Sequence, residues 1–204
     1  MLQWKQNSQG KSDLMIDGAR RIGKSYIVEE FAQKEYKSYI LVDFNNADSD
    51  LMEIFDKYLK NLDLFFSYLA LYFNVTLYPR NTAIIFDEVQ LYPKARAAIK
   101  YLVKDGRYDY IETGSLVSIN RNVKDIVIPS EECRMNMYPM DFEEFLWAMG
   151  ITPQIIDYVS ECMHDAKPVG AAIHQRLSQL MLQYCVVGGM PEAVAAFQLH
   201  HNMG

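Results

Sequence analysis

The chain has 204 residues, of which 50% are hydrophobic, and it carries a formal net charge of -6. This length and composition allow one α/β core with a small helical appendage. The acidic balance does not support sequence-independent binding to nucleic acid, which needs clustered Lys and Arg. The three cysteines form no CxxC pair, so we expect no zinc site and a reducing, cytoplasmic location. The most apolar stretch, residues 64–73, is about half as long as a membrane span, so we expect a buried helix and no membrane.

Apolar runs alternate with helical patterns along the first two thirds of the chain. The elements expected in chain order are a strand at 14–16, a helix at 24–34, a strand at 39–44, helical residues 51–73 broken near 61–63, a strand at 83–86, a helix at 94–104, a strand at 108–112 and a weak strand at 126–128. Such strands, apolar on both faces, indicate a parallel sheet with helices on both sides.

The pattern changes after Pro139, where every apolar segment has helical spacing. The helices expected there span residues 142–149, 153–163, 170–186 and 191–198. We therefore place a boundary near residues 138–141, with a core over residues 1–138 and a helical region over residues 139–204.

Residues 18–25, GARRIGKS, match the phosphate-binding pattern GxxxxGK[ST] at every fixed position. Glycines let backbone N–H groups surround phosphates, and the following helix points its positive end at them. Lys24 is expected on the β- and γ-phosphates, and the Ser25 hydroxyl on Mg²⁺. Arg20 and Arg21 either contact a phosphate and order the loop or are solvated. The residues expected to contact the nucleotide here are Gly18, Ala19, Arg20, Arg21, Ile22, Gly23, Lys24, Ser25 and Tyr26.

Two acids, Asp87 and Glu88, directly follow the apolar strand at 83–86. A parallel sheet brings the end of this strand to the edge that holds the glycine loop. Asp87 is then placed to hold Mg²⁺, and Glu88 to orient and deprotonate the attacking water. The pair favours hydrolysis over phosphate transfer to a small molecule. The alternative is an ordinary acidic strand-to-loop transition.

Five motifs run in order along nearly the whole chain: GARRIGKS at 18–25, IIFDEVQ at 84–90, ETGS at 112–115, YPMDFEEFLWAMG at 138–150 and VGGMPEAV at 187–194. With these motifs the chain resembles a bacterial and archaeal family of AAA-type ATPases, related to the AAA+ and STAND groups. The resemblance implies an α/β P-loop NTPase fold: a three-layer sandwich with a central parallel sheet and a small C-terminal helical lid. It also implies ATP and Mg²⁺ as cofactors.

The resemblance adds residues from two further segments. In AAA+-type proteins a strand between the P-loop strand and the Asp-Glu strand ends in a polar side chain that faces the γ-phosphate or the water. Thr113 or Ser115 fits that role, and an ordinary turn is the alternative. In STAND-type relatives a Gly-x-Pro element approaches the adenine. Gly189 and Pro191 match it, although a proline in the first turn of a helix explains Pro191 equally well.

The chain departs from the family at two places. Many relatives carry a Gly-Arg pair before the Tyr-Pro element, where this chain has EECR at 131–134. Arg134 or Arg121 is therefore the candidate for a charge-stabilising arginine. Relatives also continue well beyond residue 204, so we expect an N-terminal fragment of a longer protein.

These observations support three hypotheses. The first is Mg²⁺-dependent ATP hydrolysis, and ATP is favoured over GTP because the chain has no [NT]KxD guanine-recognition motif. The second is an ATP/ADP-operated switch with little turnover, which controls a missing C-terminal effector domain or another protein partner. The third is a remnant that cannot complete its fold without the lost part.

Overall fold

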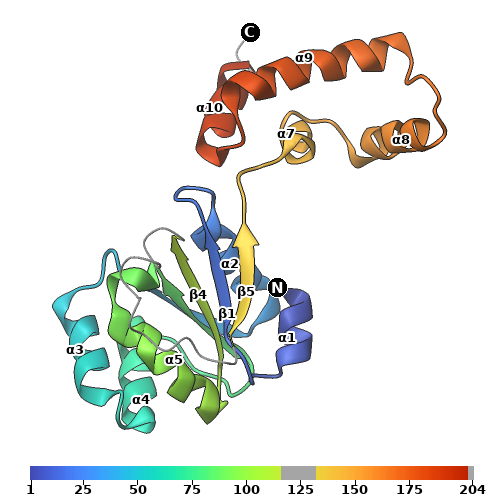
Figure 1. The fold of residues 1–204 in the computed structure, drawn as a ribbon. Coiled ribbons are helices and arrows are strands. Elements are labelled where there is room, and N and C mark those ends of the chain that lie inside the picture. Colours follow the sequence, from blue (N-terminus) through green and yellow to red (C-terminus); the bar gives the residue numbers. More distant parts are fainter. Residues whose placement is uncertain (116–131, 202–204) are drawn as a thin grey trace. The chain divides into compact units, whose positions relative to one another are not determined.

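The computed structural model describes residues 1–115 and 132–201 (Figure 1). The chain folds into two compact units, Met1–Met137 and Tyr138–Gly204. The division lies one residue before the predicted boundary, and the assignment of the second unit as a nucleotide lid stays a prediction. The expected strand at 126–128 and Arg121 lie outside the described residues.

The first unit is built on a five-stranded sheet in which every strand pair is parallel. The strands are β1 Leu14–Gly18, β2 Ser38–Asp43, β3 Thr82–Asp87, β4 Asp109–Ser115 and β5 Cys133–Met137. Their order is β2-β3-β4-β1-β5, so β4 lies between the P-loop strand β1 and the Asp-Glu strand β3, as predicted. The parallel register aligns Gly18 with Ser115, which brings the ends of β1 and β4 together.

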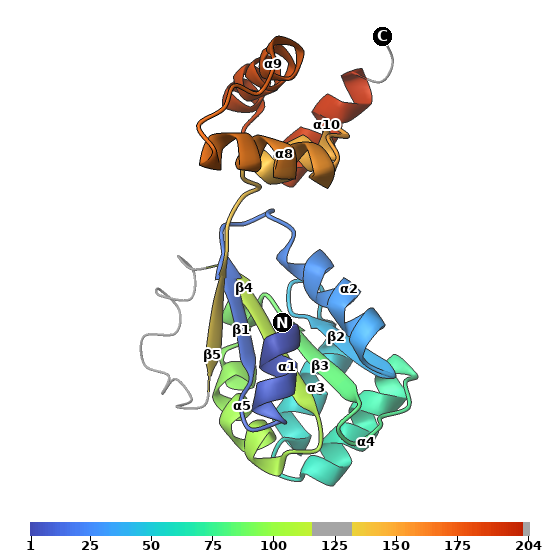
Figure 2. The same cartoon turned by 90° about the vertical axis from the view of Figure 1, so that its right-hand side faces the viewer.

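Helices cover both faces of this sheet, as Figure 2 shows. The helices of this unit are α1 Leu2–Ser8, α2 Lys24–Glu35, α3 Ser49–Tyr58, α4 Leu62–Phe73, the short 3₁₀ helix η1 Val89–Leu91 and α5 Pro93–Asp105. One hydrophobic cluster joins the sheet to α1 and α2, and a second joins it to α3, α4 and α5. The predicted three-layer α/β sandwich is therefore confirmed.

The apolar helix α4 is buried on one side only. Asn61 caps its start by accepting a hydrogen bond from the Leu64 N–H, which explains the predicted break near residues 61–63. Asn74 ends the helix in a left-handed conformation. Phe65 is buried in the core, whereas Leu71 is 76% exposed. Within residues 1–115 and 132–201, no helix has the length and apolar character that a membrane span requires.

The second unit is helical in the part that the structure describes. Its helices are α7 Phe142–Ala148, α8 Pro153–His164, α9 Ala171–Val187 and α10 Pro191–His201. Asp141 and Glu144 form a capping box at the start of α7. The unit has its own small core, centred on the buried Phe145 and Leu180.

Candidate nucleotide-binding site

The loop between β1 and α2 is shaped by its two glycines. A Cβ on Gly18 would lie 2.2 Å from the carbonyl oxygen of Met137, so only glycine fits where β1 ends beside β5. Gly23 has a φ of 90° and stands at the N-cap of α2. Because glycine has no side chain to cap the helix, the first amides of α2 are left for an anion. The loop thus has the backbone that a phosphate cradle requires.

Lys24 lies back across this loop. Its Nζ donates hydrogen bonds to the carbonyl oxygens of Ala19, at 2.7 Å, and Gly18, at 3.4 Å. Burial lowers the pKa of Lys24, while the nearby carboxylates of Glu88, Asp87 and Asp17 oppose that shift. The ammonium is buried beside the loop, where it can replace its hydrogen bonds to the loop carbonyls with hydrogen bonds to phosphate oxygens.

Three elements meet at the carboxylate of Asp87. Ser25, in the first turn of α2, donates its hydroxyl to Asp87 Oδ1 at 2.9 Å. Thr113, on β4, donates its hydroxyl to the same oxygen. The sequence places these residues far apart, and the parallel sheet brings them to one point.

Glu88 follows at a sharp turn, with a φ of 53°. Its backbone N–H donates to the Thr113 hydroxyl at 3.3 Å, so Thr113 holds the backbone of Glu88 as well as the side chain of Asp87. The Glu88 side chain accepts a hydrogen bond from the buried amide of Gln90. Gln90 belongs to the IIFDEVQ motif, but no spacing in the sequence assigns it a partner.

The other predicted residues lie at different places around the loop. Ser115 is buried at the end of β4, opposite Gly18 in the strand register. Arg20 and Arg21 are exposed, and Tyr26 is 71% exposed on the outer side of the first turn of α2. Ile22 is buried. Their contacts with a nucleotide stay predictions.

Gly189 and Pro191 belong to the second unit. The Gly189 carbonyl accepts a hydrogen bond from the Met140 N–H at 2.8 Å, and a Cβ on Gly189 would lie 2.0 Å from the Met140 oxygen. Pro191 is the first residue of α10. Each therefore has a structural role, and the adenine contact stays a prediction.

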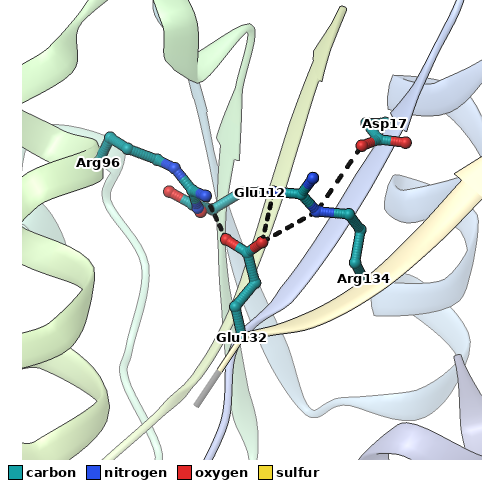
Figure 3. Close-up of polar contacts among 5 residues, drawn as sticks. All are labelled: Asp17, Arg96, Glu112, Glu132 and Arg134. Atoms are coloured by element: carbon teal, nitrogen blue, oxygen red, sulfur yellow. Dashed lines mark hydrogen bonds and ion pairs between the residues drawn. The ribbon is translucent and has the colours of Figure 1, made fainter. Parts of the chain in front are cut away.

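A cluster of ion pairs, drawn in Figure 3, joins α5 to three strands of the sheet. The fully buried guanidinium of Arg96, on α5, donates to Glu112 on β4 and to Glu132 just before β5. Arg134, on β5, donates to Glu132 at 2.9 and 3.0 Å, and its Nε lies 3.8 Å from Asp17 Oδ2. Asp17 directly precedes the first P-loop glycine, and Glu112 directly precedes Thr113.

The donors at the loop fit a magnesium-bound nucleotide. A serine hydroxyl and a carboxylate, 2.9 Å apart, are the oxygen ligands that Mg²⁺ accepts. The lysine and the uncapped start of α2 supply the positive charge and N–H donors that phosphate groups require.

The family comparison agrees with this geometry. A family described as an AAA domain matches residues 11–146, which include the P-loop, Asp87, Thr113 and β5. The chain belongs to the AAA domain family. It is therefore an AAA-type P-loop ATPase domain, and membership of this family indicates a nucleotide-binding domain.

Other comparisons add little to the AAA assignment. No curated protein matches the chain. Among solved structures, the Orc1 protein of Aeropyrum pernix in complex with DNA is similar at 9% sequence identity and a TM-score of 0.43. The match covers 98% of this chain and 63% of that one. At these values, the likeness supports neither the fold nor the function assigned to this chain.

Proposed function

We propose that this AAA domain binds ATP together with Mg²⁺ and hydrolyses the ATP. The observation that carries the proposal is the 2.9 Å hydrogen bond between Ser25 Oγ and Asp87 Oδ1. It joins the start of the P-loop helix to the end of β3 with the two oxygen donors that hold Mg²⁺ in P-loop proteins. When bound, Mg²⁺ neutralises charge on the phosphate oxygens.

The chain's own groups supply the phosphate binding. No side chain caps the start of α2, so its first amides are available to phosphate oxygens. Lys24 reaches the phosphates by releasing the Ala19 and Gly18 oxygens. Burial lowers the pKa of Lys24, and the carboxylates of Glu88 and Asp87 oppose that shift because they favour the protonated amine.

Glu88 is the proposed general base, which accepts a proton from the attacking water. Thr113 fixes the Asp87 side chain and the Glu88 backbone together, so the metal ligand and the base keep a constant spacing. Ser115 is the remaining candidate for contact with the γ-phosphate. Nucleic acid is not part of the proposal, because the net charge of -6 gives no support for it.

The substitution Glu88→Gln tests hydrolysis separately from binding. We expect the variant to bind Mg-ATP as the unchanged protein does, and to lose phosphate release by roughly 100-fold or more, the typical contribution of a general base. Glu143→Gln, the same change at an exposed position of α7, is the control and should leave both quantities unchanged. Equal loss of binding and turnover in Glu88→Gln would contradict the assignment.

One observation favours a second function, an ATP/ADP-operated switch with little turnover. The Glu88 carboxylate is held by the Gln90 amide, which keeps the proposed base occupied. Under this alternative, the nucleotide state is passed to a C-terminal effector domain or a protein partner. Equally slow phosphate release from the unchanged protein and from Glu88→Gln would favour the switch over the enzyme.

A further inference from the structure

We propose that Arg134 is a positioning residue for phosphate binding, because it neutralises the buried carboxylate of Asp17 beside the P-loop. The inference rests on the proposed binding of ATP at that loop. It gives the arginine of β5 a role through Asp17, without direct contact between the arginine and the nucleotide.

Asp17 is an acid in a place where an anion must bind. It is 2% exposed, it is joined directly to Gly18, and its Oδ1 has no hydrogen-bond partner among the described residues. Burial raises its pKa, and Arg134 is the strongest opposing influence. A buried carboxylate repels nearby phosphate oxygens unless a cation compensates for it.

Arg134 is placed to be that cation. It lies on β5, which pairs in parallel with β1, and the register aligns Asn136 with Asp17. Arg134 is two residues earlier on β5 and therefore on the same face of the sheet. Figure 3 shows its guanidinium between Asp17 and Glu132, with Nε 3.8 Å from Asp17 Oδ2.

The orientation of Arg134 is fixed by a buried pair. Its Nε and Nη2 both donate to Glu132 Oε1, and the other oxygen of Glu132 accepts from Arg96. Arg96 is anchored in turn by Glu112 on β4. The hydrogen bonds to Glu132 thus hold the guanidinium beside Asp17, although the Arg134 side chain is partly exposed.

Loss of Arg134 would change the charge balance at the loop. The charged groups that face Asp17 in the described part of the chain are Arg134, Glu132 and Lys24. Without Arg134, Glu132 keeps Arg96, and Lys24 becomes the remaining cation for Asp17. Asp17 would then compete with the phosphates for the lysine that should bind them.

A set of four proteins tests this by calorimetric titration with Mg-ATP at neutral pH. We expect Arg134→Met to raise the dissociation constant roughly fivefold to tenfold, which is the effect expected when one compensating charge is lost at a partly exposed site. The double variant Asp17→Asn with Arg134→Met should restore binding to within about twofold. Arg134→Lys keeps the charge but not the two-nitrogen contact with Glu132, so it should bind more tightly than Arg134→Met.

Two further variants control the experiment. Lys100→Met removes one positive charge from an exposed position of α5 and should leave the affinity unchanged. Asp17→Asn alone leaves Arg134 and its pair with Glu132 in place, and it should bind Mg-ATP at least as tightly as the unchanged protein. It therefore tests the proposal even if Arg134→Met does not fold, because a roughly fivefold loss in Asp17→Asn would overturn it.

The remaining outcomes separate this inference from the proposed function. An unchanged protein that binds Mg-ATP, together with an Arg134→Met variant that binds equally well, would overturn this inference alone. A defect in Arg134→Met that the added Asp17→Asn change does not restore would also overturn it, since Arg134 would then act directly or only through folding. A folded, unchanged protein without Mg-ATP binding would overturn both.

Discussion

At the scale of single residues, the site depends on one carboxylate oxygen. Asp87 Oδ1 accepts hydrogen bonds from both Ser25 and Thr113, and the Thr113 hydroxyl also accepts from the Glu88 N–H. Thr113 is fully buried, and its hydroxyl contacts both the Asp87 carboxylate and the Glu88 backbone. These hydrogen bonds explain why a polar residue is buried near the end of β4.

Thr113→Val tests this support, because valine keeps the shape and removes the hydroxyl. We expect a loss of about 1–3 kcal/mol in the free energy of unfolding, since buried partners lose a hydrogen bond. We also expect ATP turnover to fall by roughly tenfold, an activation cost of about 1.4 kcal/mol. Thr113→Ser retains the hydroxyl and is the control. Normal turnover in a folded Thr113→Val variant would contradict the assigned role.

Asp17 makes a prediction about pH. Burial raises its folded-state pKa above the ordinary value of 3.8, so ionising Asp17 in the folded protein costs stability, and this cost is fully present once the pH exceeds the raised pKa. Between the two pKa values the folded state binds more protons than the unfolded state, and stability falls as the pH rises. Asp17→Asn removes this cost and should be more stable than the unchanged protein at pH 7.

Denaturant unfolding of both proteins across a pH series checks that prediction. The advantage of Asp17→Asn should shrink as the pH falls through the raised pKa and should disappear below about 3.8, where both states of the acid are protonated. A stability difference that does not change with pH would contradict it.

The motif residues of the site are predictable from sequence, because their spacing is local and the chemistry demands it. The P-loop and the Asp-Glu pair are predictable in this way. The ion pairs of Arg96 cannot be predicted from local spacing, since they join α5, β4 and the residue before β5, which are far apart in the sequence. The only signal in the sequence is a charged residue inside an apolar pattern, such as Glu112 in the strand that ends at Thr113.

At the scale of elements, apolar patterns predict the buried strands β1 to β4 and the longer helices, including the largely exposed α8 and α9. They predict neither α1 nor β5. In β5, residues Cys133 to Asn136 are exposed, and β5 is an edge strand of the sheet among the described residues, so no alternation of apolar residues marks it. α1 is seven residues long and buries only Trp4. Backbone pairing with β1 defines β5, and that pairing has no local signature.

Gly189 in the second unit makes an element-scale prediction. Gly189→Ala would place a Cβ 2.0 Å from the Met140 oxygen, so the backbone at the start of α10 must shift. We expect a loss of about 1–3 kcal/mol in the stability of that unit. Gly150→Ala is the control, because a Cβ there meets no atom within 4 Å and only its positive φ, +80°, costs about 1 kcal/mol.

Tryptophan fluorescence can follow that unit alone. The chain has two tryptophans, Trp4 in α1 and Trp147 in α7, so a Trp4→Phe background leaves Trp147 as the probe. Urea titration should show a lower midpoint for Gly189→Ala than for Gly150→Ala. Equal midpoints would show that the close approach to Met140 does not constrain position 189.

At the scale of the whole molecule, the predicted fold class is confirmed by the parallel order β2-β3-β4-β1-β5 and by helices on both faces. The two units have separate hydrophobic clusters. The AAA domain match extends to residue 146, through β5 and into α7. The nucleotide chemistry proposed here requires only the first unit, whose loop, lysine and acids all lie before residue 116.

Calorimetric titration of the folded protein with Mg-ATP tests the central claim most directly, with Lys24→Ala as the test variant and Lys34→Ala, an exposed change in the same helix, as the control. We predict saturable one-site binding that Lys24→Ala weakens by roughly tenfold or more and that Lys34→Ala leaves unchanged. Absence of binding to the folded, unchanged protein, or equal binding by Lys24→Ala, would contradict the account.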